Sequence, residues 1–251
     1  MKFQNVYDNN EFFKSYIDMR GTDVSPNSLV EVPIIFSLIP DVKGKDILDL
    51  GCGYGKISKL FVENGAKSVM ALDISQNMID LANKQNGDKK IEYQVMAMEN
   101  IGIIDKKFDI VYSSLAFHYV KDFDLLLKNI YSLLKPNGIL VFSQESPINT
   151  AIIEKSKMEN RIEIEGKRYY LISDYNNEGL RSFKWNEVEV FKYHRTYASI
   201  VNSLIENNFK ILRMEDSIAS EEAVKKLNKL KYQKDKPYFT FVKAQKEEKA
   251  E

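Results

Sequence analysis

The sequence predicts an α/β fold built on a doubly wound, Rossmann-like sheet of mostly parallel strands. Between positions 45 and 143, short apolar runs alternate with segments of helical periodicity, the pattern of repeated strand–helix–strand units. The first apolar run contains Asp49 and leads into glycines at 51, 53 and 55, and the second ends in another acid, Asp73. Because right-handed crossovers bring the carboxyl ends of parallel strands to one edge, we expect the glycines and Asp73 to lie together there.

The elements of this region follow in a regular order. The helix after the first strand ends at Gly65, and the next begins after Ser75, whose side chain suits the position before a helix. A third helix covers 122–135, and Pro-Asn-Gly at 136–138 predicts a turn into the fifth strand. We expect the strands at 46–50, 68–72, 91–96, 108–113 and 139–143.

After Glu145 the alternation stops, and residues 147–195 predict an insertion. Strand-like pieces flank a polar loop at 174–179; they cover 161–165, 168–172 and 188–193. The alternation resumes at Thr196 with a helix, a strand at 209–214, a helix at 220–230 and a strand at 238–242. We therefore divide the chain into an N-terminal helical cap at 1–30, a cofactor-binding core at 31–146, an insertion or substrate lid at 147–195, and a C-terminal completion of the core sheet at 196–251.

The composition is that of an ordinary globular protein. Among 251 residues, Lys and Arg number 36 and so do Asp and Glu, a balance that disfavours a dedicated nucleic-acid binder. A single cysteine, Cys52, excludes an internal disulfide and a multi-cysteine metal site, and we expect no metal. No apolar run approaches the roughly 20 residues that span a bilayer. We expect a cytoplasmic protein without a membrane or nucleic-acid partner, as a monomer or homodimer.

The glycine loop alone leaves two cofactors open, a nicotinamide dinucleotide and S-adenosylmethionine. The dinucleotide pattern Gly-x-Gly-x-x-Gly/Ala places Lys56 where a small residue allows the helix to pack closely, which disfavours it. The spacing from Asp49 through Gly51, Gly53 and Gly55 instead resembles the class I S-adenosylmethionine-dependent methyltransferases. The resemblance covers most of the chain and continues, in the order of that family, through 72–75, 96–100, 108–111 and 134–138.

This resemblance implies a fold and a set of contacts. The fold is a seven-stranded sheet in the order 3-2-1-4-5-7-6, with the last strand antiparallel and a small inserted lid. The loop would pass under the methionine and ribose of S-adenosylmethionine. One acidic side chain would contact the amino group, and another would accept hydrogen bonds from the ribose hydroxyls. Ala97 stands where the family often has an acid. The cofactor-binding residues that the resemblance implies are Tyr16, Arg20, Asp49, Gly51, Gly53, Asp73, Ile74, Met98, Glu99 and Ser114.

The chemistry would be an in-line methyl transfer, for which the protein mainly aligns the acceptor. His118, which follows the fourth strand, is a candidate general base, although a structural histidine is an equal alternative. Glu145 and His194 are candidate acceptor contacts, with simple exposure at a strand end as the alternative for Glu145 and capping or packing as the equal alternative for His194. The Asn/Asp-Pro-Pro-Tyr/Phe motif of amino-methyltransferases is missing, so we expect a small-molecule acceptor. The alternatives are a non-catalytic S-adenosylmethionine-binding regulator, an RNA methyltransferase and an NAD-dependent oxidoreductase.

Overall fold

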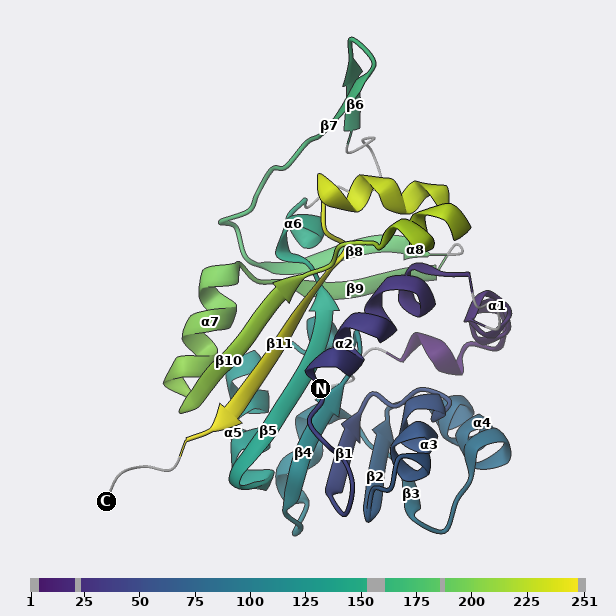
Figure 1. Ribbon diagram of the computed structural model, residues 1–251, viewed down its shortest axis with the longest axis vertical. Coiled ribbons are helices and arrows are strands. Elements are labelled where there is room, and N and C mark those ends of the chain that lie inside the picture. The colour runs from purple at the N-terminus through teal and green to yellow at the C-terminus, as the bar shows by residue number, and fades with distance from the viewer. Residues whose placement is uncertain (1–4, 21–23, 153–160, 186–187, 248–251) are drawn as a thin grey trace.

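The computed structural model describes residues 5–20, 24–152, 161–185 and 188–247 of the chain (Figure 1). Within these segments one sheet contains seven strands, and its β11 runs antiparallel to both neighbours. This confirms the expected order and the antiparallel last strand. Across the sheet the strands are β3 (Ile91–Val95), β2 (Ser68–Asp73), β1 (Asp46–Leu50), β4 (Phe108–Ser113), β5 (Leu134–Glu145), β11 (Phe239–Lys246) and β10 (Phe209–Asp216).

Helices lie on both faces of this sheet and at its carboxyl edge (Figure 1). The α-helices are α1 (Asn10–Arg20), α2 (Val32–Leu38), α3 (Lys56–Glu63), α4 (Gln76–Asn86), α5 (Phe123–Leu133), α6 (Pro147–Thr150), α7 (Tyr197–Glu206) and α8 (Glu221–Lys226). The short 3-10 helices are η1 (Val6–Asp8), η3 (Met98–Ile103), η4 (Phe117–Tyr119) and η5 (Asn228–Lys234), and η2 (Asn27–Glu31) is a π-helix.

Two hydrophobic layers hold the helices to the sheet, because successive residues of a strand point to opposite faces. Leu48 of β1 packs with Leu126 of α5 and Ile200 of α7 on one face. Its neighbour Ile47 packs with Phe61 of α3 on the other face. All five residues of β1 are buried, as expected for the centre of a parallel sheet covered on both sides.

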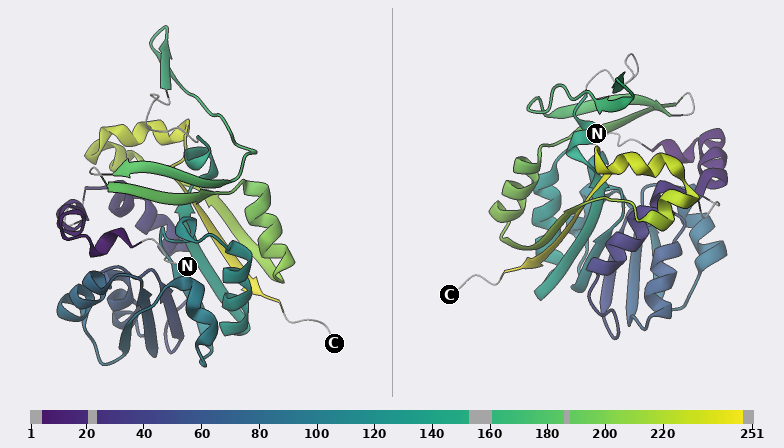
Figure 2. Two further views of the ribbon diagram at one scale, coloured as in Figure 1. Left: turned by 180° about the vertical axis from the view of Figure 1, so that it is seen from behind. Right: turned by 45° about the horizontal axis from the view of Figure 1, so that its top comes forward.

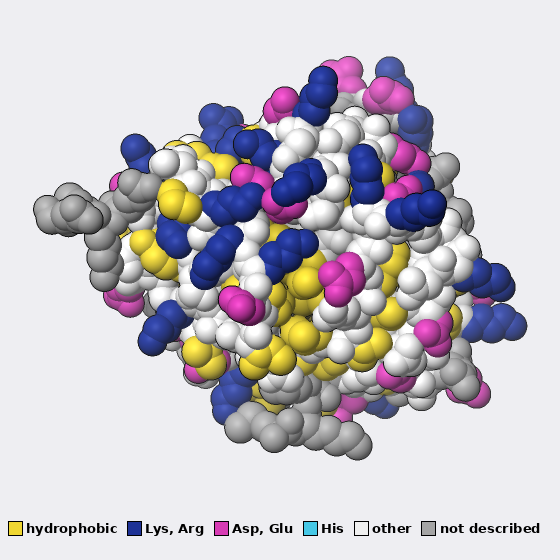
Figure 3. Space-filling model, turned by 90° about the horizontal axis from the view of Figure 1, so that it is seen from below, with side chains coloured by type: hydrophobic (Ala, Val, Ile, Leu, Met, Phe, Trp, Pro, Cys, Tyr) yellow, Lys and Arg dark blue, Asp and Glu magenta, His cyan; other side chains and the backbone are white. Residues whose placement is uncertain are grey.

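The amino-terminal edge of the parallel strands carries charged groups in pairs. Lys135 Nζ lies 2.9 Å from Asp46 Oδ2 and 2.7 Å from Asp109 Oδ2. The face seen from below shows acidic and basic side chains intermixed around exposed apolar atoms (Figure 3). These ion pairs lie opposite the edge at which parallel sheets of this kind bind ligands.

Two hairpins form the described part of the insertion (Figure 2). They are the antiparallel pairs β6 (Arg161–Ile164) with β7 (Lys167–Tyr170) and β8 (Gly179–Trp185) with β9 (Val188–His194). The β8–β9 hairpin lies across the carboxyl end of the sheet, whereas β6–β7 projects away from it (Figure 1; Figure 2). No helix in the described segments is both long and apolar enough to cross a membrane.

Two expectations about elements are wrong, and one strand was missed. The strand expected at 139–143 begins at Leu134, so Pro-Asn-Gly lies within β5, where the register with β4 shifts and Asn137 adopts φ +59°. Strand β8 begins at the end of the expected loop and was not foreseen. The helix expected at 220–230 ends at Lys226 and is followed by η5. The four proposed chain divisions remain predictions.

Candidate functional site

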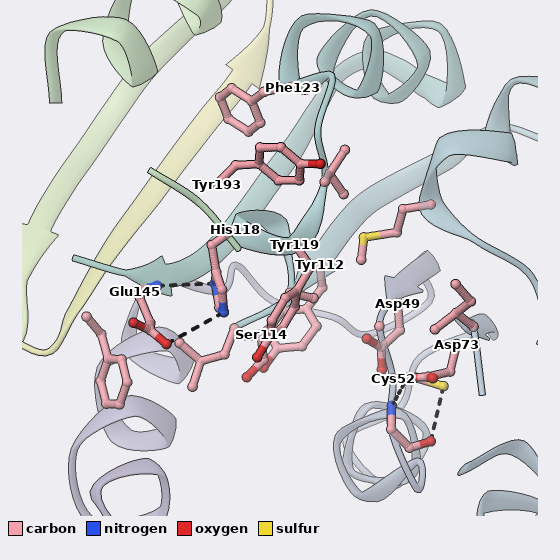
Figure 4. Close-up of a pocket in the computed structure, with 18 of the residues that line it drawn as sticks. Asp49, Cys52, Asp73, Tyr112, Ser114, His118, Tyr119, Phe123, Glu145 and Tyr193 are labelled. Carbon is pink, nitrogen blue, oxygen red and sulfur yellow. Dashed lines mark hydrogen bonds and ion pairs between the residues drawn. The ribbon is translucent and has the colours of Figure 1, made fainter. Parts of the chain in front are cut away.

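A cavity of about 1750 Å³ opens at the carboxyl ends of β1, β2, β4 and β5 (Figure 4). It exceeds the 300–1,000 Å³ typical of a pocket for one small molecule, so it has room for two. We call the part beside Asp49, Gly51, Gly53 and Asp73 the glycine end. The part beside His118, Tyr119, Phe123 and Tyr193 is the aromatic end.

Two glycines shape the loop after β1 at the glycine end. Gly51 has φ +74°, and a Cβ there would lie 2.7 Å from Ala116 Cβ, so only glycine lets this loop approach the turn after β4. Gly53 has φ +54°, lines the cavity, and has no protein atom within 4 Å of the place a Cβ would occupy. The loop is thus a cradle whose open side faces the cavity.

Two buried carboxyl groups lie beside this cradle (Figure 4). Asp73 accepts hydrogen bonds from the backbone N–H groups of Gly53 and Ser75, both at 2.9 Å. Asp49 Oδ2 accepts a hydrogen bond from the Ser58 hydroxyl at 2.6 Å. Burial raises the pKa of Asp73 to about 6 and that of Asp49 to about 7. Both groups therefore sit where a ligand with N–H or O–H donors would favour their charged forms.

The wall of the glycine end continues over the loops after β2 and β3. Ile74 and Met98 line the cavity with apolar side chains, as a flat aromatic ligand requires. Glu99, at the start of η3, also lines it, and burial raises the pKa of this carboxyl. Ser114, the residue after β4, also borders the cavity, as expected.

Hydrogen bonds join the N-terminal segment to the start of α4, beside the glycine end of the cavity. Asp8 Oδ1 accepts hydrogen bonds from the Ser75 hydroxyl at 2.6 Å and the Asn77 backbone N–H at 3.2 Å, at the start of α4. The rings of Tyr7 and Tyr16 lie edge to face at 4.9 Å, and both residues line the cavity. The side chain of Arg20, expected here as well, is outside the part of the chain that the structure describes.

His118 in η4 is buried at the aromatic end (Figure 4). The Glu145 backbone N–H donates to His118 Nδ1 at 3.3 Å, so Nδ1 is the accepting nitrogen and Nε2 carries the proton of the neutral ring. Nε2 lies 4.0 Å from Glu145 Oε1. Burial lowers the pKa of His118 to about 4; the Glu145 charge opposes this, and those of Lys192 and Arg195 reinforce it. The arrangement favours a hydrogen-bond donor over the expected general base.

Glu145 ends β5 and lines the cavity, with both oxygens engaged. Lys192 Nζ of β9 lies 2.6 Å from each of them, and Asn149 Nδ2 donates to Oε2 at 3.0 Å. Lys192 is itself buried. This ion pair fastens the β8–β9 hairpin to the end of the sheet, and removing either partner would leave a buried charge unmatched.

His194, expected to contact the acceptor, does not face the cavity, because side chains alternate in direction along β9. Phe191, Tyr193 and Arg195 line the cavity, whereas His194 is buried on the opposite face and does not line it. Its Nε2 lies 2.8 Å from the Tyr175 carbonyl oxygen and its Nδ1 lies 2.8 Å from Thr150 Oγ1. Because a carbonyl only accepts, Nε2 donates and Nδ1 accepts, and His194 is a structural residue.

Two cavity residues escaped the sequence reasoning. Arg195 follows His194 by one position, so the period of two in β9 would have pointed to it. Glu31, the last residue of the π-helix η2, is buried, and its Oε1 accepts hydrogen bonds from the hydroxyls of Ser114 at 2.8 Å and Ser143 at 2.6 Å. No local motif marks Glu31, because tertiary packing alone brings it to the strand ends.

Comparison with known proteins identifies the family. A methyltransferase-domain family model matches residues 48–142. A Haemophilus influenzae protein named only as uncharacterised is 36% identical over 250 residues, which are 97% of this chain and 98% of that protein. The crystal structure of an S-adenosylmethionine-dependent methyltransferase from Mesorhizobium loti is 32% identical, with a TM-score of 0.80 over 89% of this chain and 99% of that one. The chain is an S-adenosylmethionine-dependent methyltransferase.

The family membership decides the cofactor, and the nicotinamide alternative is set aside. The glycine end of this methyltransferase fits S-adenosylmethionine, because it offers two carboxyl groups for amino and hydroxyl donors, an apolar wall, and an open cradle at Gly53. The acceptor is not decided in this way. A malonyl-[acyl-carrier protein] O-methyltransferase from Serratia marcescens is 33% identical over 100 residues, only 40% of this chain and 38% of that protein.

Proposed function

We propose that this methyltransferase transfers the methyl group to a small-molecule acceptor held at the aromatic end of the cavity. The observation that carries the proposal is the continuity of one cavity from the glycine end to the aromatic end, beneath the β8–β9 hairpin. Tyr119, Phe123 and Tyr193 give the aromatic end an apolar lining suited to a carbon skeleton (Figure 4). A partly open cavity lined by side chains in this way suits a small molecule better than a nucleic-acid strand.

The residues of the glycine end would hold the cofactor in one orientation. S-adenosylmethionine, when bound, supplies a methyl group already activated on a positively charged sulfur. In our proposal Asp73 accepts hydrogen bonds from ribose hydroxyls and Asp49 accepts one from the amino group. Ile74 and Met98 flank the adenine with Glu99 near its edge, while Ser114 and Tyr16 lie toward the methionine portion. Arg20 remains a predicted partner of the methionine carboxylate.

The residues of the aromatic end would align the acceptor and exclude water, which are the main tasks in an in-line transfer from an activated donor. His118 would orient an acceptor oxygen through Nε2–H, since Nδ1 is occupied by the Glu145 backbone. Glu145 would act through its pair with Lys192, which holds the hairpin in place. We propose residues 147–195 as the lid that covers the acceptor.

The first test measures cofactor binding and turnover separately. We expect S-adenosylhomocysteine to bind, and Asp73→Asn to weaken binding by about 100-fold, because charge-assisted hydrogen bonds to the carboxylate are lost. Calorimetry on folded protein gives both affinities, and formation of S-adenosylhomocysteine reports turnover across a metabolite panel. Turnover with bulk RNA alone would overturn the small-molecule acceptor. Cofactor binding with no turnover on any substrate would favour the non-catalytic regulator.

His118→Gln separates the two roles of the histidine. A glutamine keeps a hydrogen-bonding side chain but cannot take up a proton near neutral pH. If His118 orients the acceptor, KM for the acceptor rises while the pH dependence of kcat is retained. A loss of about 100-fold or more in kcat, together with loss of the acid limb of the profile, would instead establish the general base.

A further inference from the structure

Arg195 brings a charged group with unused donors to the aromatic end. Its Nη2 donates to the backbone carbonyls of Val120 and of Lys121, the latter at 3.1 Å. Among the described residues, Nε and Nη1 have no hydrogen-bond acceptor and no carboxylate lies within 4.0 Å of the guanidinium. The guanidinium carbon lies 4.9 Å from the Phe123 ring centroid. A partly enclosed guanidinium against an aromatic ring, with donors to spare, is suited to an anionic ligand.

A second cation lies in the same region. Lys236 is only 6% exposed, and no carboxylate of the described residues lies within 4.0 Å of its Nζ. Burial lowers the pKa of Lys236; the negative charge of Glu145 opposes this shift and the positive charge of Lys192 adds to it. Lys236 does not line the cavity, so it can act on a ligand there only through its field and not by direct contact.

The other polar groups of the aromatic end do not pair directly with the Arg195 donors. Glu178 lines the cavity, but its Oε1 accepts the Thr196 backbone N–H at 2.6 Å at the start of α7. Glu145 is already held by Lys192 and Asn149. His118 is neutral and presents Nε2–H, a donor. The charges of Glu178, Asp124 and Asp122 act on Arg195 from a distance, but none of these carboxylates lies within 4.0 Å of its guanidinium, so Nε and Nη1 remain available as donors to a ligand.

We propose that the aromatic end recognises a carboxylate group of the acceptor molecule, through Arg195 and with His118 Nε2–H as a further donor. The proposal rests on the proposed function, because it names the class of small molecule that this end takes. The rings of Phe123 and Tyr193 contact the carbon skeleton, and Lys236 adds a favourable field without contacting the ligand. A neutral ligand would leave the Arg195 donors unmatched, and an ammonium ligand would be repelled by Arg195.

Benzoate and benzamide test this proposal, because they share a ring and differ in charge. Binding of each to the protein saturated with S-adenosylhomocysteine is measured by ligand-observed NMR at millimolar concentrations. We expect benzoate to bind at least about 10-fold more tightly than benzamide, the factor that one charge-assisted hydrogen bond provides. Arg195→Gln should bring the ratio close to unity, and Arg195→Lys should retain part of it. Arg213→Gln, which removes an exposed guanidinium from β10, is the matched control and should change nothing.

Lys236→Met provides a second variant that leaves the carbonyl contacts of Arg195 untouched, and it should reduce the ratio by a smaller factor. Equal binding of the two probes, no benzoate binding, or a ratio that survives Arg195→Gln in a folded variant would overturn the proposal. The same comparison without S-adenosylhomocysteine separates it from the proposed function. If S-adenosylhomocysteine does not bind, the proposed function fails, and the ratio still decides whether the carboxylate site exists.

Discussion

Gly53 offers the sharpest residue-scale test of the glycine end, because Gly44 is a natural match for it. Both have positive φ, +54° and +74°, and neither has a protein atom within 4 Å of the place a Cβ would occupy. Only Gly53 lines the cavity. We expect Gly53→Ala and Gly44→Ala each to reduce the free energy of unfolding by about 1 kcal/mol, the cost of a left-handed non-glycine residue.

The two variants should differ in ligand binding. Calorimetry with S-adenosylhomocysteine should show a loss of at least about 10-fold in affinity for Gly53→Ala, because the added methyl group enters the cradle, and no change for Gly44→Ala. Equal affinities in both variants would show that the backbone at Gly53 does not approach the cofactor.

His118 gives a prediction about stability and pH. Its pKa of about 4 in the folded protein lies below the ordinary 6.5. Between these values the unfolded chain binds a proton that the folded chain does not, so folding stability falls as the pH drops from 6.5 to 4. Relative to His118→Gln, which does not titrate there, the wild type should lose on the order of 3 kcal/mol over this window. Urea unfolding at pH 7 and pH 4.5 measures the difference, and parallel changes in both proteins would contradict the buried neutral ring.

Four of the cofactor-binding candidates that line the cavity share one property. Asp49, Gly53, Asp73 and Ser114 each lie at or just after a strand end, so the local motif and the parallel topology together fix their position at one edge. The prediction for His194 did not hold because alternate residues of β9 face the cavity, and His194 belongs to the other set. Which set faces inward depends on how the hairpin packs on the sheet, and no short motif encodes that.

At the scale of elements, Glu31 links the N-terminal helices to two strands. Its carboxylate accepts hydroxyl hydrogen bonds from the ends of β4 and β5, beside Leu115, a non-glycine residue at φ +51°. Glu31→Ala would leave the hydroxyls of half-buried Ser114 and buried Ser143 without this acceptor. We expect a loss of about 2–3 kcal/mol in the free energy of unfolding, the range for hydrogen bonds to a charged group. Urea denaturation monitored by circular dichroism measures it.

Ser37→Ala on the neighbouring helix α2 is the control for this variant. The Ser37 hydroxyl donates only to the Ile34 carbonyl and is exposed, so its loss should stay within about 0.5 kcal/mol. A Glu31→Ala protein as stable as Ser37→Ala would mean that the N-terminal segment is not held through this carboxylate.

The strands and helices of the core were predictable because periodicity and glycine or serine boundaries agreed there. β1 and β4 have the expected bounds, and Ser75 caps α4 by accepting the Met78 N–H. The insertion was harder. β8 has no clear alternation of apolar and polar residues, and Arg181 within it is buried because it donates to backbone carbonyls such as that of Ala151. A buried arginine satisfied by carbonyls looks, in sequence, like a surface residue.

At the scale of the whole molecule, the cavity depends on parts that are distant in the chain. The core supplies the glycine end, η4 and β5 supply one wall of the aromatic end, and the inserted hairpin supplies the other (Figure 2; Figure 4). Three side chains hold the hairpin in place. Lys192 pairs with the Glu145 carboxylate, and Arg195 and Arg181 donate hydrogen bonds to the backbone carbonyls of Lys121 and Ala151. The acceptor site therefore exists only in the complete fold, which is why motifs alone predicted the cofactor end better.

Cofactor binding should couple to the stability of the whole molecule and to pH. A ligand at 100 times its Kd stabilises the folded state by about 2.7 kcal/mol, or about 5–10 °C in Tm for a chain of this size. In the free protein the pKa values of Asp73 and Asp49 are about 6 and about 7. Hydroxyl and amino donors of S-adenosylhomocysteine favour the charged carboxylates, so below these values binding must release protons.

The Tm increase caused by S-adenosylhomocysteine should therefore be largest at pH 8 and smaller at pH 5. Below the pKa of each acid that must ionise, the affinity falls by up to about 10-fold per pH unit. Thermal unfolding with and without the ligand at both pH values measures the difference, and Asp73→Asn should lose part of it because the amide does not titrate. An increase that is the same at pH 5 and pH 8 would mean that neither carboxyl changes protonation on binding, and the contacts proposed for Asp49 and Asp73 would have to be reassigned.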